Sequence, residues 1–310
     1  MTAGTVRIWD AYAEGRRQLE AVGVPEAGLD AWYLLEYVTG ISRASFYADP
    51  DRKMTSDWQK EYARAITRRA ERVPLQHITG IQEFMGLPFR VSEDVLIPRQ
   101  DTETLVEEAL NLLKEESRSG PGRACSGGGR ILDLCTGSGC ILLSVLHYAG
   151  TKGNGAAPEG VGADLSAKAL ETAAGNAGML GIRAEFVQGD LFEHVEGKFQ
   201  MILSNPPYIR SAEIEKLQEE VRIHDPREAL DGGEDGLYFY RRITDEAGAY
   251  LVPGGHLLFE IGYDQAEDVC GIMQKAGYTG IRVKKDLAGL DRVVCGVYSG
   301  EELSGSASQK

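Results

Sequence analysis

The spacing of hydrophobic residues predicts that the first 72 residues are helical. Apolar side chains recur there at intervals of three to four residues, and no strand-like alternation interrupts them. Breaks at Gly23-Val24-Pro25 and at Ala48-Asp49-Pro50 divide the apolar stretches. We therefore expect residues 1–72 to form a small bundle of about four helices.

Residues 73–100 have a different sequence pattern. Apolar residues alternate with polar ones there, and glycines and prolines interrupt them. This pattern favours a β-hairpin that links two domains. Asp101, Thr102 and Glu103 then mark the start of a helix predicted to end near residue 116. Residues 117–129 are rich in glycine and serine and predict a surface loop, and residues 301–310 predict a flexible tail.

Beyond residue 129, short apolar runs alternate with helical patterns. The predicted strands span residues 130–134, 161–164, 184–188, 199–204, 255–261, 280–285 and 292–298. The predicted helices span residues 139–148, 166–180, 237–251 and 264–276. This order predicts an α/β domain over residues 101–300 with a seven-stranded, mostly parallel, doubly wound Rossmann-like sheet. Because the last two strands are close in sequence, we expect one of them to be antiparallel.

Composition and charge exclude several classes of protein. The chain has 310 residues, of which 33 are Lys or Arg and 47 are Asp or Glu, so the formal net charge is −14. An extended nucleic-acid surface is disfavoured, because it would need a basic face. The sequence has no signal-peptide pattern and no run of ~20 apolar residues, so we expect a cytoplasmic protein. The five cysteines lie far apart without a zinc pattern, and we expect reduced thiols and no metal.

The first strand of the predicted sheet leads into a glycine-containing turn and then a helix. The turn reads Cys135-Thr136-Gly137-Ser138-Gly139. In an open α/β sheet this is where nucleotide-like ligands bind, because glycines let the backbone approach and the helix start offers free N–H groups. The alternative is a purely structural turn.

The next two strands each end near an acidic residue. Asp164 lies about 25 residues after the glycine turn, where a carboxylate can accept hydrogen bonds from both hydroxyls of a ribose. The alternative role is a helix cap for residues from Ser166 onward. Asp190 can accept a hydrogen bond from an exocyclic amine while Leu191 or Phe192 packs on a purine face. A plain turn aspartate is the alternative here.

The fourth strand is followed by Asn205-Pro206-Pro207-Tyr208. The two prolines fix the backbone and remove two donors, which leaves the carbonyl groups around them free to accept hydrogen bonds. Together with the Asn205 side chain, these carbonyls can hold both hydrogens of a planar NH₂ group, with Tyr208 as a flat wall. The cluster therefore predicts a substrate site for a planar amino group, formed by Asn205, Pro206, Pro207 and Tyr208.

These motifs resemble those of S-adenosylmethionine-dependent methyltransferases that act on planar amino groups. More narrowly, residues 97–103, 74–80 and 226–237 resemble segments of the peptide-chain release factor glutamine methyltransferases, the PrmC/HemK family. The resemblance covers nearly the whole chain. Cys135 stands where that family has the first glycine of its turn, and Gln100 stands where it has proline. We expect Cys135 to be tolerated if its φ is negative, with weaker cofactor affinity as the cost.

The resemblance implies methyl transfer from S-adenosylmethionine to the glutamine side-chain nitrogen in the Gly-Gly-Gln motif of class I release factors. It implies Asn205, Pro206 and Tyr208 as catalytic residues, and no metal. The cofactor-binding residues that follow from the motifs are Cys135, Thr136, Gly137, Ser138, Gly139, Asp164, Asp190, Leu191 and Asn205. No direct nucleic-acid binding and no membrane association are expected.

Three alternatives remain at this point. The acceptor is a base in a nucleic acid, or a glutamine in a ribosomal protein, or the chain is a non-catalytic adapter with a vestigial cofactor fold. The helical region is expected to dock the protein substrate. Its basic residues either meet an acidic patch on that partner or form a solvated helix face, and they are Arg64, Arg68, Arg69 and Arg72.

Overall fold

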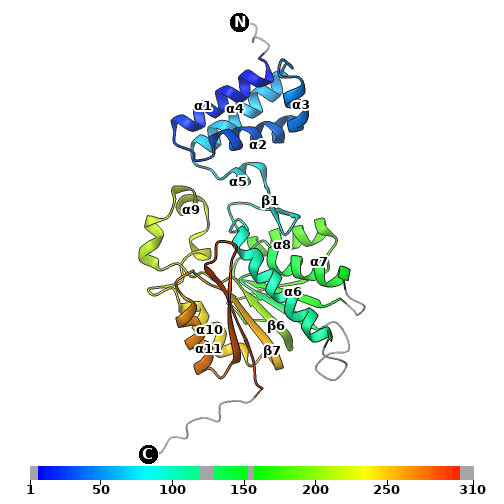
Figure 1. Cartoon of the computed structure of the whole chain (residues 1–310), viewed down its shortest axis with the longest axis vertical. Coiled ribbons are helices and arrows are strands. Elements are labelled where there is room, and N and C mark those ends of the chain that lie inside the picture. The colour runs from blue at the N-terminus through cyan, green and yellow to red at the C-terminus, as the bar shows by residue number, and fades with distance from the viewer. Residues whose placement is uncertain (1–5, 119–128, 153–156, 301–310) are drawn as a thin grey trace, which may run out of the picture. The chain divides into compact units, whose positions relative to one another are not determined.

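The structure is a computed structural model that describes residues 6–118, 129–152 and 157–300. It divides into two compact units (Figure 1). The first consists of residues 1–81 and 218–224, and the second of residues 82–217 and 225–310. Most of the predicted loop and all of the predicted tail lie outside the described residues, as does Cys125.

The first unit is a helical bundle, as its sequence pattern predicts. Its helices are α1 (Ile8–Ala21), α2 (Ala27–Thr39), α3 (Arg43–Ala48), α4 (Ser56–Ala70), α5 (Leu75–Thr79) and α9 (Glu219–His224). The side chains of Ser42 and Thr55 cap α3 and α4 by accepting backbone N–H groups of the first turn. The apolar faces of the helices meet in a core that includes fully buried Leu19, Leu34 and Leu35.

The β-hairpin is shorter than the sequence pattern predicts. Its strands are β1 (Ile81–Phe84) and β2 (Leu87–Arg90), whereas the preceding residues 75–79 form the helix α5. The expectation of strand structure there is wrong because Leu75 and Ile78 have helical spacing, and both pack on the core of the bundle. In the hairpin, Phe84 and Phe89 are fully buried, which anchors it on the core of the second unit.

The second unit contains a seven-stranded sheet in the order β5-β4-β3-β6-β7-β9-β8. The strands are β3 (Arg130–Leu134), β4 (Glu159–Asp164), β5 (Glu185–Gln188), β6 (Phe199–Ser204), β7 (Leu251–Glu260), β8 (Thr279–Lys285) and β9 (Asp291–Val297). Strands β5, β4, β3, β6 and β7 are parallel, and β9 is antiparallel to both of its neighbours. The prediction of a mostly parallel sheet with one reversed strand near its end is confirmed.

Helices cover both faces of this sheet, as Figure 1 shows. They are α6 (Glu103–Arg118), α7 (Cys140–Lys152), α8 (Ala167–Leu180), α10 (Tyr238–Ala247) and α11 (Ala266–Lys275), with short 3₁₀ helices η1 (Gln100–Thr102), η2 (Ser211–Lys216) and η3 (Arg227–Ala229). Successive strand residues point to opposite layers: Ile131 packs with α6 and α7, and Leu132 packs with α10 and α11. Each layer is therefore a separate hydrophobic core.

The register of the parallel strands brings the predicted site residues to one edge. Leu134 of β3 lies opposite Ala163 of β4 and Ser204 of β6. Ser204 in turn lies opposite Phe259, one residue before the end of β7. Because these strands end side by side, the residues that follow each of them meet at the carboxyl edge of the sheet.

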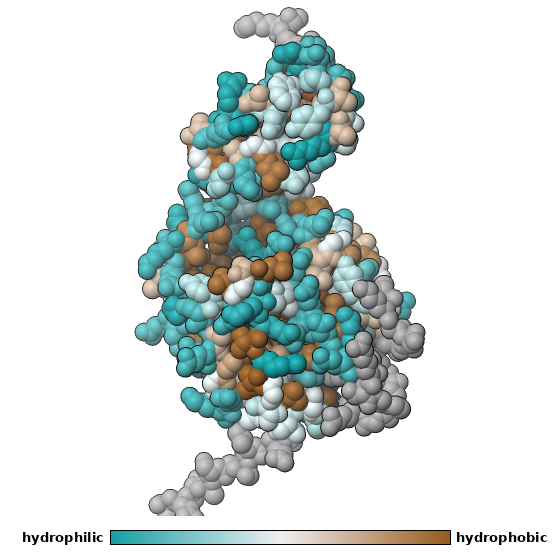
Figure 2. All heavy atoms as spheres, viewed as in Figure 1, coloured by the Kyte–Doolittle hydropathy of each residue, from teal (hydrophilic) through white to brown (hydrophobic). Residues whose placement is uncertain are grey.

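On the face seen in Figure 2, hydrophilic residues cover most of the surface and hydrophobic residues form small separate patches. Exposed hydrophobic side chains scattered in this way are ordinary for a folded domain. No helix within the described part of the chain is long and apolar enough to cross a membrane.

The basic residues of α4 do not form one solvated face. Arg69 is buried, and its guanidinium donates to Asp30 Oδ2 at 2.7 Å, to Glu220 Oε1 at 2.8 Å and to the Val73 carbonyl at 3.3 Å. Arg72 reaches the same Glu220 carboxylate at 3.4 Å. These contacts join α9 to the bundle, although Arg69 and Glu220 are 151 residues apart in the sequence. Arg69 thus serves the interior of the first unit.

Arg69→Ala should lower the free energy of unfolding of the first unit by about 3–5 kcal/mol, because it leaves the buried Asp30 carboxylate without its partner. Exposed Arg64 on the same helix is the control. Arg64→Ala should change the free energy of unfolding by less than about 0.5 kcal/mol. The three tryptophans, Trp9, Trp32 and Trp58, all lie in this unit, so urea denaturation followed by tryptophan fluorescence measures the effect. Equal losses in both variants would contradict this assignment.

Candidate functional site

A cavity lies in the second unit at the carboxyl ends of β3, β4, β5 and β6. Eight of the nine residues predicted to bind the cofactor line it: Cys135, Thr136, Gly137, Ser138, Asp164, Asp190, Leu191 and Asn205. The segment before α6 closes another side of the cavity with residues 94–99 and Thr102, and residues 226, 228, 229 and 239 complete it. The fold therefore gathers residues from seven separate parts of the sequence around one space.

The glycine turn after β3 has two glycines with different tasks. Gly137 (φ 54°) lines the cavity, and a Cβ placed there would meet nothing within 4 Å. Gly139 (φ 78°) does not line the cavity, and a Cβ there would lie 3.2 Å from the Ala173 side chain of α8. Gly139 therefore lets α7 begin close to α8, which is a packing role, and its contact with a ligand stays a prediction.

Cys135 has a φ of +57°, so the condition under which we expected cysteine to be tolerated, a negative φ, is not met. The left-handed conformation brings the Cβ of an L-residue close to the following carbonyl and costs about 1–2 kcal/mol. The turn imposes this conformation because the chain must change direction between the end of β3 and the start of α7. Burial raises the pKa of the Cys135 thiol, so the thiol stays protonated at neutral pH.

Asp164, the acidic residue at the end of β4, forms a hydrogen bond with the glycine turn that follows β3. Its Oδ2 accepts the backbone N–H of Gly137 and its Oδ1 accepts that of Ser166, both at 2.9 Å. Ser166, rather than Asp164, is the residue that caps α8, since its hydroxyl accepts the N–H of Ala169. Burial raises the pKa of Asp164, and the two backbone N–H groups lower it. Each carboxylate oxygen keeps a lone pair for a further donor.

The sequence pattern did not single out Leu165, which follows Asp164 and also lines the cavity. Its side chain is 60% exposed, which is unusual for a leucine between a central strand and its helix. An apolar side chain presented to a cavity can pack against a flat ring. Its place directly after the acidic end of β4 was the signal that could have identified it.

Asp190 lines the cavity but already has a partner. Both of its carboxylate oxygens lie 3.0 Å from Arg242 Nη1, on α10. Any amine that binds Asp190 must share the carboxylate with this guanidinium. The neighbouring Leu191 is buried with a φ of +57°, a second strained position in the cavity wall.

The Asn205-Pro206-Pro207-Tyr208 cluster is only partly at the cavity. Asn205 and Pro207 line it, whereas Pro206 and Tyr208 are not among the lining residues. The Asn205 side-chain nitrogen lies 3.5 Å from the Thr102 hydroxyl, which comes from the segment before α6. The Tyr208 ring packs against the hydrophobic core, and its carbonyl accepts from Gln265 Nε2 at 3.1 Å.

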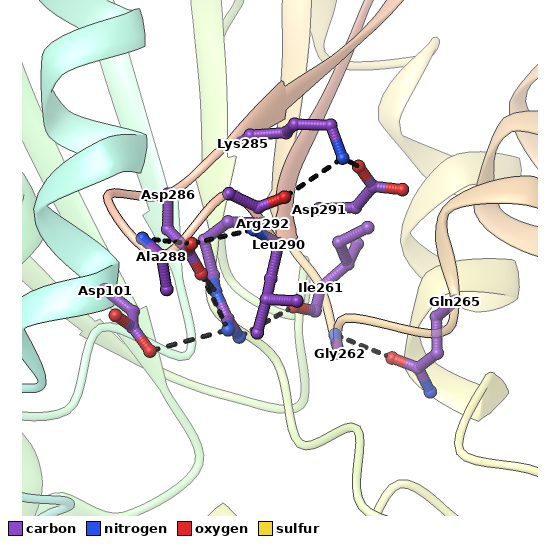
Figure 3. Close-up of polar contacts among 11 residues, drawn as sticks. Asp101, Ile261, Gly262, Gln265, Lys285, Asp286, Ala288, Leu290, Asp291 and Arg292 are labelled. Carbon is purple, nitrogen blue, oxygen red and sulfur yellow. Dashed lines mark hydrogen bonds and ion pairs between the residues drawn. The ribbon is translucent and has the colours of Figure 1, made fainter.

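A buried polar cluster lies at the end of β7, next to these residues. Glu260 is 2% exposed, and burial raises the pKa of its carboxyl to about 7, while Thr102, Arg292 and Tyr208 lower it. The Arg292 guanidinium donates to Asp286 Oδ2 at 3.0 Å and to the Ile261 carbonyl at 3.2 Å, and it lies 3.4 Å from Asp101 (Figure 3). Sequence reasoning missed this cluster because its members are scattered along the chain.

Two sequence profiles match the chain. The profile of the PrmC N-terminal domain matches residues 10–80, and that of the methyltransferase small domain matches residues 123–261. The "Release factor glutamine methyltransferase" of Agrobacterium fabrum is 44% identical over 282 residues, which are 90% of this chain and 93% of the relative. The protein of the same name from Geobacter sulfurreducens is 41% identical over 91% of this chain and 93% of the relative.

A solved structure is similar at the level of the fold. The hMettl16 catalytic domain superposes with a TM-score of 0.53 over 78% of this chain and 84% of that chain, at 13% identity. At this identity the likeness concerns the fold alone.

Cys135→Gly should give a more stable protein than Cys135→Ala, by about 1 kcal/mol, because both remove the thiol and only glycine relieves the left-handed strain. Urea denaturation followed by far-ultraviolet circular dichroism measures the difference. A glycine variant less stable than the alanine variant would show that the turn does not strain this residue.

Glu260→Gln should stabilise the protein most at alkaline pH. The folded pKa of Glu260 is about 7 and its reference value is 4.5, so ionising the folded carboxyl above pH 7 costs about 3 kcal/mol. The stability advantage of the variant over the unaltered protein should be largest above pH 7 and fall as the pH drops towards 4.5. Thermal denaturation from pH 5 to 8 measures it, and an advantage independent of pH would contradict the burial argument.

Proposed function

The chain belongs to the family of release factor glutamine methyltransferases, and we propose that it transfers a methyl group from S-adenosylmethionine to the glutamine of the Gly-Gly-Gln motif in class I release factors. The acceptor atom is the side-chain amide nitrogen. The observation that carries this proposal is that Asn205, the polar residue of the Asn-Pro-Pro-Tyr cluster, lines the same cavity as Asp164. Groups suited to the donor and to the acceptor therefore share one space.

The cavity residues fit the adenosine part of S-adenosylmethionine. The unused lone pairs of Asp164 suit the two ribose hydroxyls, and exposed Leu165 offers an apolar surface for adenine. Gly137 leaves room for the backbone to approach the methionine part. When bound, the cofactor supplies an electrophilic methyl group on a sulfonium.

Asn205 and Pro206 would orient the acceptor. A glutamine amide nitrogen is a poor nucleophile because its lone pair is delocalised into the carbonyl group. The Asn205 side-chain oxygen and the Pro206 carbonyl can each accept one of the two amide hydrogens, which fixes the direction of the nitrogen. Alignment of this kind is worth roughly 7–11 kcal/mol in well-oriented reactions. The Tyr208 ring would support the cluster from the core side rather than cover the substrate.

A nucleic-acid base also presents a planar amino group, but the charge of the chain disfavours that acceptor. A net charge of −14 opposes approach to a phosphate backbone. A ribosomal-protein glutamine has the same amide chemistry, and the family to which the chain belongs favours the release factor.

Intact-mass spectrometry tests the function directly. A class I release factor is incubated with this protein and S-adenosylmethionine, beside the same factor with its Gly-Gly-Gln glutamine changed to alanine. The first should gain one methyl group and the second none. Equal methylation of both would place the acceptor elsewhere, and no methylation despite cofactor binding would favour another substrate.

Asp164→Asn should raise the dissociation constant of S-adenosylmethionine by about 10–100-fold, since hydrogen bonds to a charged group are worth about 1.5–3 kcal/mol. Asp190→Asn should have a smaller effect, because Arg242 already engages that carboxylate. Isothermal titration calorimetry measures both. A larger effect at Asp190 would reverse the assignment of the ribose and adenine ends of the cavity.

A further inference from the structure

The proposed function places a specific demand on Asn205. Its side-chain amide has an accepting oxygen at one end and a donating nitrogen at the other, and the two ends have nearly the same shape. Only the oxygen can accept a hydrogen from the substrate amide. The side chain must therefore be held with its nitrogen away from the substrate.

Thr102 is placed to hold that nitrogen. Asn205 Nδ2 donates to Thr102 Oγ1 at 3.5 Å, and Thr102 is 2% exposed, so water does not replace this contact. A hydroxyl by itself does not settle the orientation, since it can either donate to the amide oxygen or accept from the amide nitrogen. A third group has to fix the direction of the hydroxyl proton.

Glu260 supplies this group. Glu260 is buried at the end of β7, where it directly follows Phe259. Phe259 pairs with Ser204 at the end of the β6–β7 register, and Asn205 directly follows Ser204, so Glu260 and Asn205 leave the sheet side by side. The Oε2 of Glu260 makes no hydrogen bond to the described residues, and Thr102 is among the side chains that lower its pKa. An ionised carboxylate only accepts hydrogen bonds, so a nearby ionised Glu260 would draw the Thr102 proton towards itself. The lone pairs of Thr102 then remain for a donor, which is the Asn205 nitrogen.

We propose that Thr102 and Glu260 are positioning residues, which hold the Asn205 amide with its nitrogen towards Thr102 and its oxygen towards the cavity. This inference rests on the proposed function. It assigns a specific task to Thr102 within the segment of residues 97–103, whose sequence resembles the family and which also lines the cavity.

Other residues of this segment fix its position. Arg99 Nη2 donates to buried Asp225 at 2.7 Å, and Asp101 lies 3.4 Å from Arg292 of β9 (Figure 3). The carboxylate of Glu103 accepts the backbone N–H of Met85 in the hairpin at 2.7 Å. Contacts with Asp225, Arg292 and Met85, which are far apart in the sequence, thus fix the backbone on both sides of Thr102. The Thr102 hydroxyl is therefore held in place relative to Asn205.

The arrangement also predicts a dependence on pH. When Glu260 is protonated, its proton points to Thr102, and the Thr102 proton then points to Asn205, which favours the reversed amide. Burial raises the pKa of Glu260 to about 7, so methyl transfer should fall as the pH drops below 7. The groups that face Glu260 are Arg292 from β9, Asp101 from η1, Tyr208 after β6, Tyr240 from α10 and Cys140 from α7.

The test compares hydroxyl variants in the full-length protein, with methyl transfer to a release factor as the readout. At pH 8, Thr102→Val should lower kcat by about 10–100-fold and leave the KM for S-adenosylmethionine within about twofold, whereas Thr102→Ser should stay within about threefold of the unaltered protein. Thr244→Val is the matched control, because Thr244 is equally buried and its hydroxyl has no partner among the described residues. Its kcat should not change.

Two further comparisons separate positioning from general damage. In the Asn205→Ala background, Thr102→Val should lower the residual rate less than twofold, because the residue it positions is gone. Glu260→Gln should lower kcat at pH 8 by about tenfold and abolish the fall in rate below pH 7. Equal losses from Thr102→Val with and without Asn205, or an unchanged pH profile in Glu260→Gln, would overturn the proposal.

A nuclear magnetic resonance measurement tests the geometry without any turnover. The side-chain ¹⁵N–¹H₂ resonances of Asn205, identified by their loss in Asn205→Ala, should shift in Thr102→Val and not in Thr244→Val. If they shift as expected but the unaltered protein methylates no release factor, the proposed function fails and the positioning holds. If the Asn205 resonances do not shift in Thr102→Val, Thr102 does not position Asn205, whichever substrate the protein methylates.

Discussion

The candidate site depends on one constraint, the parallel register that makes β3, β4 and β6 end side by side. Leu134 lies opposite both Ala163 and Ser204, so the turns that follow these strands meet at one edge. Asp164 fastens two of them together by accepting the backbone N–H of Gly137 at 2.9 Å. A shift of one residue in this register would turn the strand side chains to the wrong face and separate the turns.

The same edge holds part of the backbone strain of the second unit. Cys135 and Leu191 both have a φ of +57°, and the carboxyls of Asp133 and Glu260 are buried deeply enough for burial to raise the pKa of each to about 7. None of these features favours folding, and the two layers of hydrophobic core around the sheet offset them. Strain and buried charge that gather at one edge are typical of a site shaped by function rather than by stability.

Periodicity predicted most of the fold, because the strands of the second unit are short apolar runs and its helices have clear termini. It failed at residues 75–79, where a five-residue helix is too short for its period to stand out, and it gave no element for α9 and the 3₁₀ helices near it. Local motifs predicted nine residues of the cavity wall, which are the eight cofactor residues and Pro207. Thr102, Glu260 and Arg292 escaped prediction because only the folded sheet brings them together, and nothing in their local sequence marks a buried polar contact.

We propose that Asn205 acts mainly on the acceptor, whereas the other predicted cofactor residues of the same cavity hold S-adenosylmethionine. The most direct measurement determines, for Asn205→Ala, the rate of methyl transfer to a release factor together with the dissociation constant of S-adenosylmethionine. We expect the rate to fall a hundredfold or more while the dissociation constant changes less than about threefold. Equal losses of rate and of cofactor affinity would contradict this division of tasks.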